Sequence, residues 1–92
     1  MAFPISHDEQ CHEFSTVVEG HRGLLRYRLA GDVMRIVHTE VAPEIEGHGI
    51  AGDLMRAALA AARASGWRVQ PACSYARWFL EQHREFDDLL AQ

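Results

Sequence analysis

The sequence of 92 residues lacks long apolar runs, and this absence limits where the protein can act. Nowhere do about eighteen apolar residues come together, so the chain offers no candidate for a transmembrane helix. Its first ten residues contain Asp8 and Glu9 and no apolar segment long enough for a secretory signal. We therefore expect a cytoplasmic protein without a membrane partner.

Basic residues are too few for a typical nucleic-acid-binding protein. Nine Lys and Arg residues stand against thirteen Asp and Glu, and the formal net charge is -4. Binding to DNA or RNA draws on the release of counterions from neutralised phosphates, and an acidic chain gains little from it. We expect no nucleic-acid partner.

Cysteine is also scarce, with only Cys11 and Cys73 present. Without an export signal, two cysteines are more often free thiols than a disulfide. The six histidines and two cysteines show neither H-x-x-x-H nor C-x-x-C spacing, which structural zinc sites favour. We predict no metal site.

The sequence contains no internal repeat, no low-complexity tract and no linker. A chain of this length can bury one core, but it has no room for a full dinucleotide-binding sheet and a substrate domain. We therefore predict a single domain over residues 1–92 with one compact site.

Three strands are predicted in the first half of the chain, over residues 13–18, 23–29 and 33–41. These segments are rich in strand-forming residues, and the second alternates apolar residues with arginines. Glu19-Gly20 and Gly31-Asp32 separate them, and short glycine-containing breaks between apolar runs favour hairpins. The prediction is a three-strand antiparallel meander.

The second half predicts two helices and one further strand. Apolar residues recur at helical spacing over residues 49–65, and a glycine follows, as is typical of a helix end. Residues 68–72 should pair parallel with residues 33–41 through a right-handed crossover. A helix over residues 74–83 and a helical turn over residues 86–90 complete an α/β (α+β) fold with a mixed sheet.

Gly47, Gly49 and Gly52 match G-x-G-x-x-G, the fingerprint of dinucleotide-binding folds. That fold needs its first glycine close to the end of a strand, whereas residues 42–46 intervene after the predicted strand. It also needs an acidic residue about twenty positions further on, and residues 70–74 contain none. The dinucleotide fold is therefore excluded, but glycines at a helix N-terminus still favour a phosphorylated ligand.

Residues 38–54 (HTEVAPEIEGHGIAGDL) resemble the strand, loop and helix by which the GNAT superfamily of N-acetyltransferases binds acetyl-coenzyme A (acetyl-CoA). The superfamily loop has the pattern Gln/Arg-x-x-Gly-x-Gly/Ala, and Gly49 and Ala51 match its last two fixed positions. Residues 71–76 (PACSYA) resemble a second pattern, found in a small GNAT-like subgroup of about this length. The likeness extends over residues 14–90, and its two motifs occur in the expected order.

The resemblance implies a GNAT-like fold and an enzyme that transfers an acetyl group from acetyl-CoA to an amine. It implies that a strand bonds the pantetheine arm, that the glycine loop cradles the pyrophosphate, and that the acyl carbonyl lies near Cys73. The residues assigned to acetyl-CoA on this basis are His38, Thr39, Glu40, Val41, Gly47, His48, Gly49, Ile50, Ala51, Gly52, Cys73 and Tyr75. A short chain leaves the acceptor side open, which favours a protein or peptide amine over an enclosed small molecule.

Cys73 and His38 are the candidate catalytic residues. Cys73 falls at a predicted helix N-terminus, where a thiolate is favoured, and could carry the acetyl group, although unpaired cysteines are often simply buried. His38 could act as a general base near the thioester. Its alternation with Met34 and Ile36 places it on one strand face with apolar residues, so a histidine bonded within the fold is an equal alternative.

Several other residues have both a functional and a purely structural interpretation. Tyr75 could protonate the leaving thiolate, but its spacing with Trp78 and Phe79 favours a place in the core. His48 contacts phosphate or is merely exposed in the loop. Three arginines could hold the 3'-phosphate of coenzyme A or, by default, lie on a solvated strand face: Arg22, Arg26 and Arg28.

Two residues depart from the family pattern. Glu46 stands where glutamine or arginine is usual, so its charge should weaken pyrophosphate binding unless the side chain points away. Arg84 stands where the subgroup often has a proline, so the second helix is expected to continue past His83. Two other functions stay open, namely an acyl-CoA-binding module without turnover and an interaction domain that kept only the fold.

Overall fold

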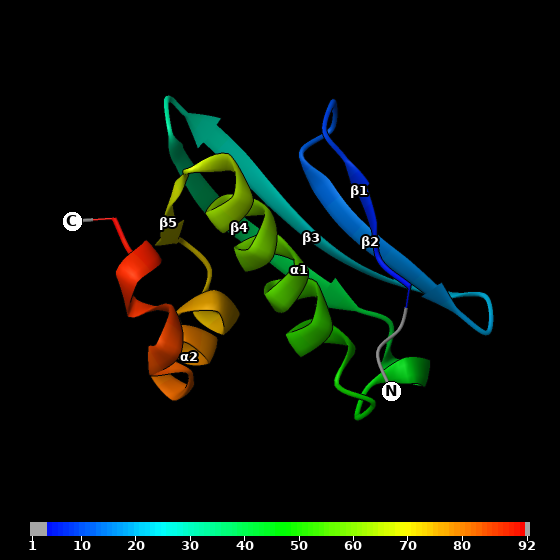
Figure 1. Cartoon of the computed structure of the whole chain (residues 1–92). Helices are drawn as coiled ribbons and strands as arrows, with labels where there is room; N and C mark the ends of the chain where they lie inside the picture. The colour runs from blue at the N-terminus through cyan, green and yellow to red at the C-terminus, as the bar shows by residue number, and fades with distance from the viewer. Residues whose placement is uncertain (1–3, 92) are drawn as a thin grey trace.

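The computed structural model describes residues 4–91 and shows a sheet with helices packed on it (Figure 1). Residues 1–3 and 92, at the ends of the predicted domain, lie outside the described residues. The elements in chain order are β1 (Ser6–Asp8), β2 (Glu13–Val18), β3 (His21–Ala30), β4 (Val33–Val41), the 3-10 helix η1 (Pro43–Ile45), α1 (Ile50–Ser65), β5 (Arg68–Pro71), α2 (Ser74–Gln82) and the 3-10 helix η2 (Arg84–Leu89).

The sheet has the strand order β1-β2-β3-β4-β5. Strands β1 to β4 form an antiparallel meander, and β5 lies parallel to β4, so the predicted mixed sheet of an α+β fold is confirmed. β1 adds a fourth strand to the predicted meander. Its three residues are too few for a recognisable alternation, and all are exposed.

Helix α1 lies across one face of the sheet and supplies the centre of the core (Figure 1). Leu54 and Ala58, one turn apart on the helix, are fully buried, as are Leu25 and Ile36 of the sheet. The helix ends at Gly66, whose φ of 74° gives the left-handed cap that the sequence predicts. The opposite face of the sheet carries the exposed arginines of β3.

An extra residue in β4 changes which face its side chains occupy. Arg26 of β3 lies opposite His38, whereas the next residue, Tyr27, lies opposite Ile36, so Val37 forms a β-bulge. Directly opposite residues share a face, and Arg26 is exposed while Tyr27 is buried. His38 therefore faces solvent, and its predicted place on the apolar face of Ile36 is wrong because the bulge shifts the alternation by one residue.

Strands β4 and β5 separate halfway along β4. Their pairing ends with Ile36 opposite Pro71, after which the Ala72 N–H still donates to Ile36 O over 2.8 Å. The chain then turns into α2 at Ser74. No described strand pairs with residues 37–41 on the side that β5 leaves, so this edge of β4 is open at a fork between the two strands.

Arg84 does not carry the second helix past His83, contrary to the expectation from the sequence. α2 stops at Gln82, and His83 adopts φ -127° and ψ 75°, outside the helical region. Arg63 of α1 donates to Asp88 Oδ2 over 2.7 Å and holds the following turn against α1. The break thus occurs at His83 without a proline, and the turn that follows it is tied to α1 by this ion pair.

Cys73 is the residue at which α2 begins. Its Sγ accepts the Ala76 N–H at 3.4 Å, and its carbonyl oxygen accepts the Arg77 N–H at 3.1 Å. The side chain thus takes the capping role that serine, threonine or aspartate usually fills. Since the residue is only partly buried, its sulfur both caps the helix and borders the surface.

This capping role predicts different stabilities for two substitutions. Cys73→Ser should keep the free energy of unfolding, because a hydroxyl also accepts the Ala76 N–H, whereas Cys73→Ala should lower it by about 0.5–2 kcal/mol. Urea denaturation followed by circular dichroism measures both. Cys11→Ala, at the exposed cysteine, is the control and should change stability by less than about 0.5 kcal/mol. Equal losses in the two Cys73 variants would contradict the cap.

Candidate functional site

A glycine loop joins β4 to α1. Ile45 of η1 is almost fully buried and anchors the loop to the core. Gly47 and Gly49 have φ values of 84° and 76°, in the left-handed region that residues with a Cβ seldom adopt. Gly49 is also the N-cap of α1 and brings no side chain to cover the first turn of the helix.

The first N–H groups of α1 therefore have no partner within the helix. Those of Ile50, Ala51 and Gly52 precede the first intrahelical bond, which the Asp53 N–H donates to Gly49 O over 3.0 Å. They carry the partial positive charge of a helix N-terminus. The loop and these groups together suit an anion such as a phosphate.

Two adjoining hollows run from this loop along β4. The loop hollow, of about 320 Å³, is lined by Val41, Ile45, Glu46, Gly47, Gly49, Ile50, Ala51, Gly52, Tyr75 and Trp78. The strand hollow, of about 250 Å³, is lined by Thr39, Glu40, Val41, Glu46, Ala51 and Tyr75. Because they share much of their lining, we treat them as one groove.

Cys73 lies at the fork, across from β4. Its Sγ is 3.7 Å from Thr39 Oγ1, and Thr39 shares a sheet face with the buried Leu25. Thr39 also lines the strand hollow. The groove thus has the glycine loop at one end and the Cys73 thiol beside its other end.

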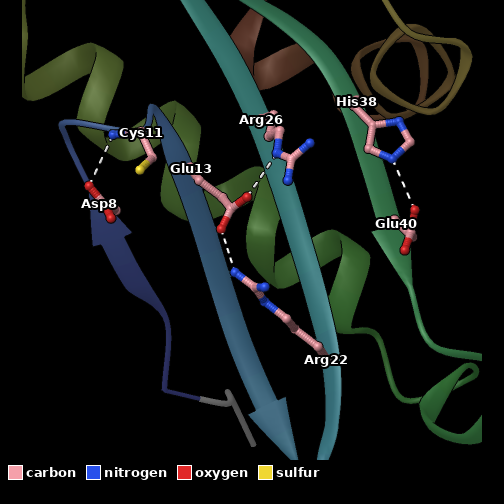
Figure 2. A network of polar contacts seen from close by, with 7 residues as sticks. All are labelled: Asp8, Cys11, Glu13, Arg22, Arg26, His38 and Glu40. Atoms are coloured by element: carbon pink, nitrogen blue, oxygen red, sulfur yellow. Dashed lines mark hydrogen bonds and ion pairs between the residues drawn. The ribbon is translucent and has the colours of Figure 1, made fainter.

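His38 points to the other face of β4. Its Nε2 is 3.1 Å from Glu40 Oε1, and both side chains are largely exposed (Figure 2). Thr39 and Cys73 lie toward α1, so the structure does not bring the two candidate catalytic side chains together on one face. A role for His38 as a base stays a prediction for an amine that arrives from the uncovered face.

Tyr75 lines both hollows and also packs among aromatic side chains. Its ring centroid lies 5.8 Å from that of Trp78 and 6.3 Å from that of Phe79. Burial raises the pKa of the Tyr75 hydroxyl above its ordinary value, and the nearby Arg56 guanidinium partly offsets this effect. At neutral pH the hydroxyl keeps its proton and can donate a hydrogen bond into the groove.

The arginines of β3 lie away from the glycine loop. Arg22 and Arg26 both donate to the carboxylate of Glu13, over 2.5 Å and 2.8 Å, on the uncovered face of the sheet (Figure 2). Arg28 is exposed on the same strand. These positions support the reading of a solvated strand face over a role at the 3'-phosphate.

Sequence reasoning missed two residues beside the loop hollow. Arg56 follows Gly52 by one helical turn, and a Cβ placed on Gly52 would come within 3.1 Å of Arg56 Nη1. Helical spacing could have identified this neighbour. Trp78 is 53% exposed and lines the loop hollow, although its spacing with Tyr75 and Phe79 favours the core. No local signal in the sequence marks Trp78 as exposed, because it lies next to the buried residues of α2, which are Ala76, Phe79 and Leu80.

Glu46 and His48 occupy different positions relative to the groove. Glu46 lines both hollows, so its charge lies close to the glycine loop. His48 is exposed between Gly47 and Gly49 and is not among the residues that line either hollow. Of the two, Glu46 would therefore act more strongly on an anion at the glycine loop.

Within residues 4–91, no three His, Cys, Asp or Glu side chains gather into a group that could hold a metal ion. In the same residues, no helix has both the length and the apolar character that crossing a membrane requires.

Comparisons with known proteins agree with this fold. A solved solution NMR structure of a GCN5-like protein from Staphylococcus aureus matches with a TM-score of 0.78 at 24% sequence identity, over 97% of this chain and 88% of that one. This likeness supports the fold. None of the curated proteins compared with the chain matches it. A family model described as GCN5-related N-acetyl-transferase matches residues 13–89. Since the match covers most of the chain, the chain belongs to the GCN5-related N-acetyltransferase family.

Proposed function

We propose that the protein binds acetyl-CoA in the groove and transfers its acetyl group to an amine. The observation that carries this proposal is the free edge of β4, residues 37–41, which extends between the glycine loop and the Cys73 thiol. A long ligand would match that arrangement if its phosphates lay at the glycine loop and its terminal thioester lay near the Cys73 thiol. When bound, acetyl-CoA supplies an acetyl group activated as a thioester.

The free edge of β4 suits the pantetheine arm. Its amide groups can bond the backbone of residues 38–41 as an added strand would. These backbone groups have no partner strand on that side among the described residues. Thr39, Glu40 and Val41 would therefore contribute mainly through the main chain.

The glycine loop suits the pyrophosphate. The N–H groups of Ile50, Ala51 and Gly52 would donate to phosphate oxygens, and the helix N-terminus favours their negative charge. Glu46 opposes this attraction because it lines the same hollow. The Arg56 guanidinium lies beside Gly52 and would offset Glu46 only in part, because Asp53 is 3.8 Å from it.

Cys73 allows two routes for the transfer. In one, the amine attacks the thioester carbonyl directly, the C–S bond breaks, and the released thiolate takes up the proton that the amine loses, while the Cys73 thiol only borders the fork. In the other, the Cys73 thiolate attacks the carbonyl carbon, and coenzyme A leaves as a thiol after taking up a proton. The amine then attacks the acetylated cysteine, forming the amide and restoring the Cys73 thiol. In both routes, backbone N–H groups would stabilise the oxyanion.

The uncovered face of β4 is where the acceptor amine would arrive. His38 and Glu40 are largely exposed there, which leaves room for a flexible protein or peptide segment. The His38 imidazole could take the proton of the incoming ammonium, and the Glu40 carboxylate would stabilise the charged ring.

An acyl-CoA-binding module without turnover is the second candidate function. The bulge at Val37 favours it over transfer through an acetylated cysteine, because Cys73 then has no His38 imidazole on its own face of the sheet. Release of free coenzyme A thiol on addition of amines would argue for the transferase, and binding without release would argue for the module.

Gly49→Val should abolish binding of acetyl-CoA. Valine is strained at a φ of 76°, and its side chain would block the backbone from the phosphates. Isothermal titration calorimetry measures the loss. Gly31→Val, at a φ of 61° in the turn between β3 and β4, imposes similar strain outside the groove and should bind like the parent. A Gly49→Val variant that binds as well as the parent would show that the cradle is misplaced.

Glu46→Gln should tighten acetyl-CoA binding by a few tenths to about 1 kcal/mol, because it removes a negative charge near the phosphates. The gain should shrink in titrations at high salt. Glu44→Gln is the matched control, since Glu44 is exposed and faces His21 at 3.6 Å instead of the groove. An unchanged affinity in Glu46→Gln would mean that this carboxylate does not act on the phosphates.

Incubation with acetyl-CoA and no acceptor should leave an acetyl group on Cys73 if this residue carries the acyl group. Peptide mass spectrometry detects the modification, and the exposed Cys11 serves as an internal control in the same sample. Cys73→Ser should then bind acetyl-CoA but lose turnover. A Cys73→Ser variant with most of its activity would establish direct transfer instead.

A further inference from the structure

Trp78 is a large apolar side chain left in solvent beside the groove. Among the described residues, only Val17 and Trp78 are large hydrophobic side chains with high exposure, at 65% and 53%. Val17 lies on the uncovered sheet face opposite Arg22, whereas Trp78 lines the loop hollow. A single exposed indole is common on protein surfaces, but this one forms part of the lining of the loop hollow, where a bound ligand would cover it.

The surroundings of Trp78 suit a flat ring that carries phosphates. Trp78 lies one turn from Tyr75 on α2, and the two ring centroids are 5.8 Å apart. The same hollow is lined by Gly47 and Gly49, next to the first N–H groups of α1. Arg56 adds a half-exposed guanidinium whose carboxylate neighbour, Asp53, is 3.8 Å away. An aromatic side chain and backbone donors thus meet at one end of the groove, and a cation lies beside them at Gly52.

The acceptor amine is a poor occupant for this position. Trp78 lines the loop hollow and is not among the residues of the strand hollow, which extends to Thr39 beside Cys73. An acceptor has to reach the thioester near that thiol. The part of the ligand beyond the pyrophosphate, in contrast, has to leave the groove at the loop end.

We propose that Trp78 binds the adenine ring of coenzyme A by stacking its indole on the base. The inference rests on the proposed function, because it takes the pyrophosphate to lie at the glycine loop. Every nucleobase has a flat π face, and stacking on an aromatic side chain is a general way to hold it. Trp78 is then a binding residue for the nucleotide end, separate from the residues at the fork.

Calorimetry with two ligands tests this assignment. Trp78→Ala should weaken coenzyme A binding by about 5- to 140-fold, the range expected for loss of a base–aromatic stack. It should leave the affinity for 4'-phosphopantetheine, which lacks the adenosine, within about twofold of the parent. Trp78→Phe, which keeps an aromatic face, should retain most of the coenzyme A affinity.

Fluorescence gives a second measurement that does not depend on turnover. The chain has two tryptophans, and Trp67 packs against Tyr27 with ring centroids 6.2 Å apart. In a Trp67→Phe background the emission therefore comes from Trp78 alone. Coenzyme A and 3',5'-ADP should quench it, and 4'-phosphopantetheine should not.

The outcomes separate the two proposals. If the parent protein binds neither coenzyme A nor 4'-phosphopantetheine, the proposed function fails, and this inference fails with it. If the parent binds coenzyme A but Trp78→Ala binds it equally well, only the adenine assignment is overturned. Equal weakening of both ligands would also overturn it, because Trp78 would then act on the loop or the pantetheine arm.

Discussion

The short pairing between β4 and β5 is the constraint on which the groove and the proposed ligand site depend. The two strands pair only from Val33 and Arg68 to Ile36 and Pro71, and β4 then continues to Val41 without β5. Backbone N–H and C=O groups of a strand edge need partners, and free edges are usually covered or blocked. Here the edge borders a groove that also contains the first turn of α1. A strand-like ligand would complete the ladder, which is why the fork is central to the proposed function.

The β-bulge in β4 divides the chemistry of the fork between two faces. Val37 is the extra residue, and it turns His38 toward solvent while Thr39 faces α1 and contacts Cys73. A carbonyl held between the strands would be accessible from both sides, with the thiol on one and the imidazole on the other. This separation suits an acceptor amine that approaches from the uncovered face, because the His38 imidazole, the proposed base, lies on that face.

The charge distribution shows which groups an acidic chain would offer to the phosphorylated ligand that we propose. Glu13 is almost buried, and a carboxylate in that position needs paired cations, which Arg22 and Arg26 supply. These arginines stabilise the fold and are not available to the groove. The proposed phosphate site would rely instead on backbone N–H groups, because Arg56 beside it is paired with Asp53 and Glu46 is an opposing charge. Affinity for the phosphates should therefore depend more on loop geometry than on net charge.

Most of the elements and most of the groove lining could be predicted from the sequence, because their signals are local. Alternation identified β2 to β4, helical spacing identified α1 and α2, and two short motifs, residues 38–54 and 71–76, identified the loop and the cysteine. Gly49 adopts the left-handed conformation that only a glycine adopts without strain. Such features depend on a few neighbouring residues, so they can be recognised in the chain alone.

The tertiary structure alone decided which side chains meet. The bulge at Val37 depends on the register of β4 against β3, and the helix break at His83 accompanies the contact between Arg63 and Asp88. Trp78 borders the glycine loop only because α2 packs beside α1. Each of these features results from contacts between residues far apart in the sequence. Such contacts can override the local conformational preference of a segment, and the residues of that segment alone do not indicate them.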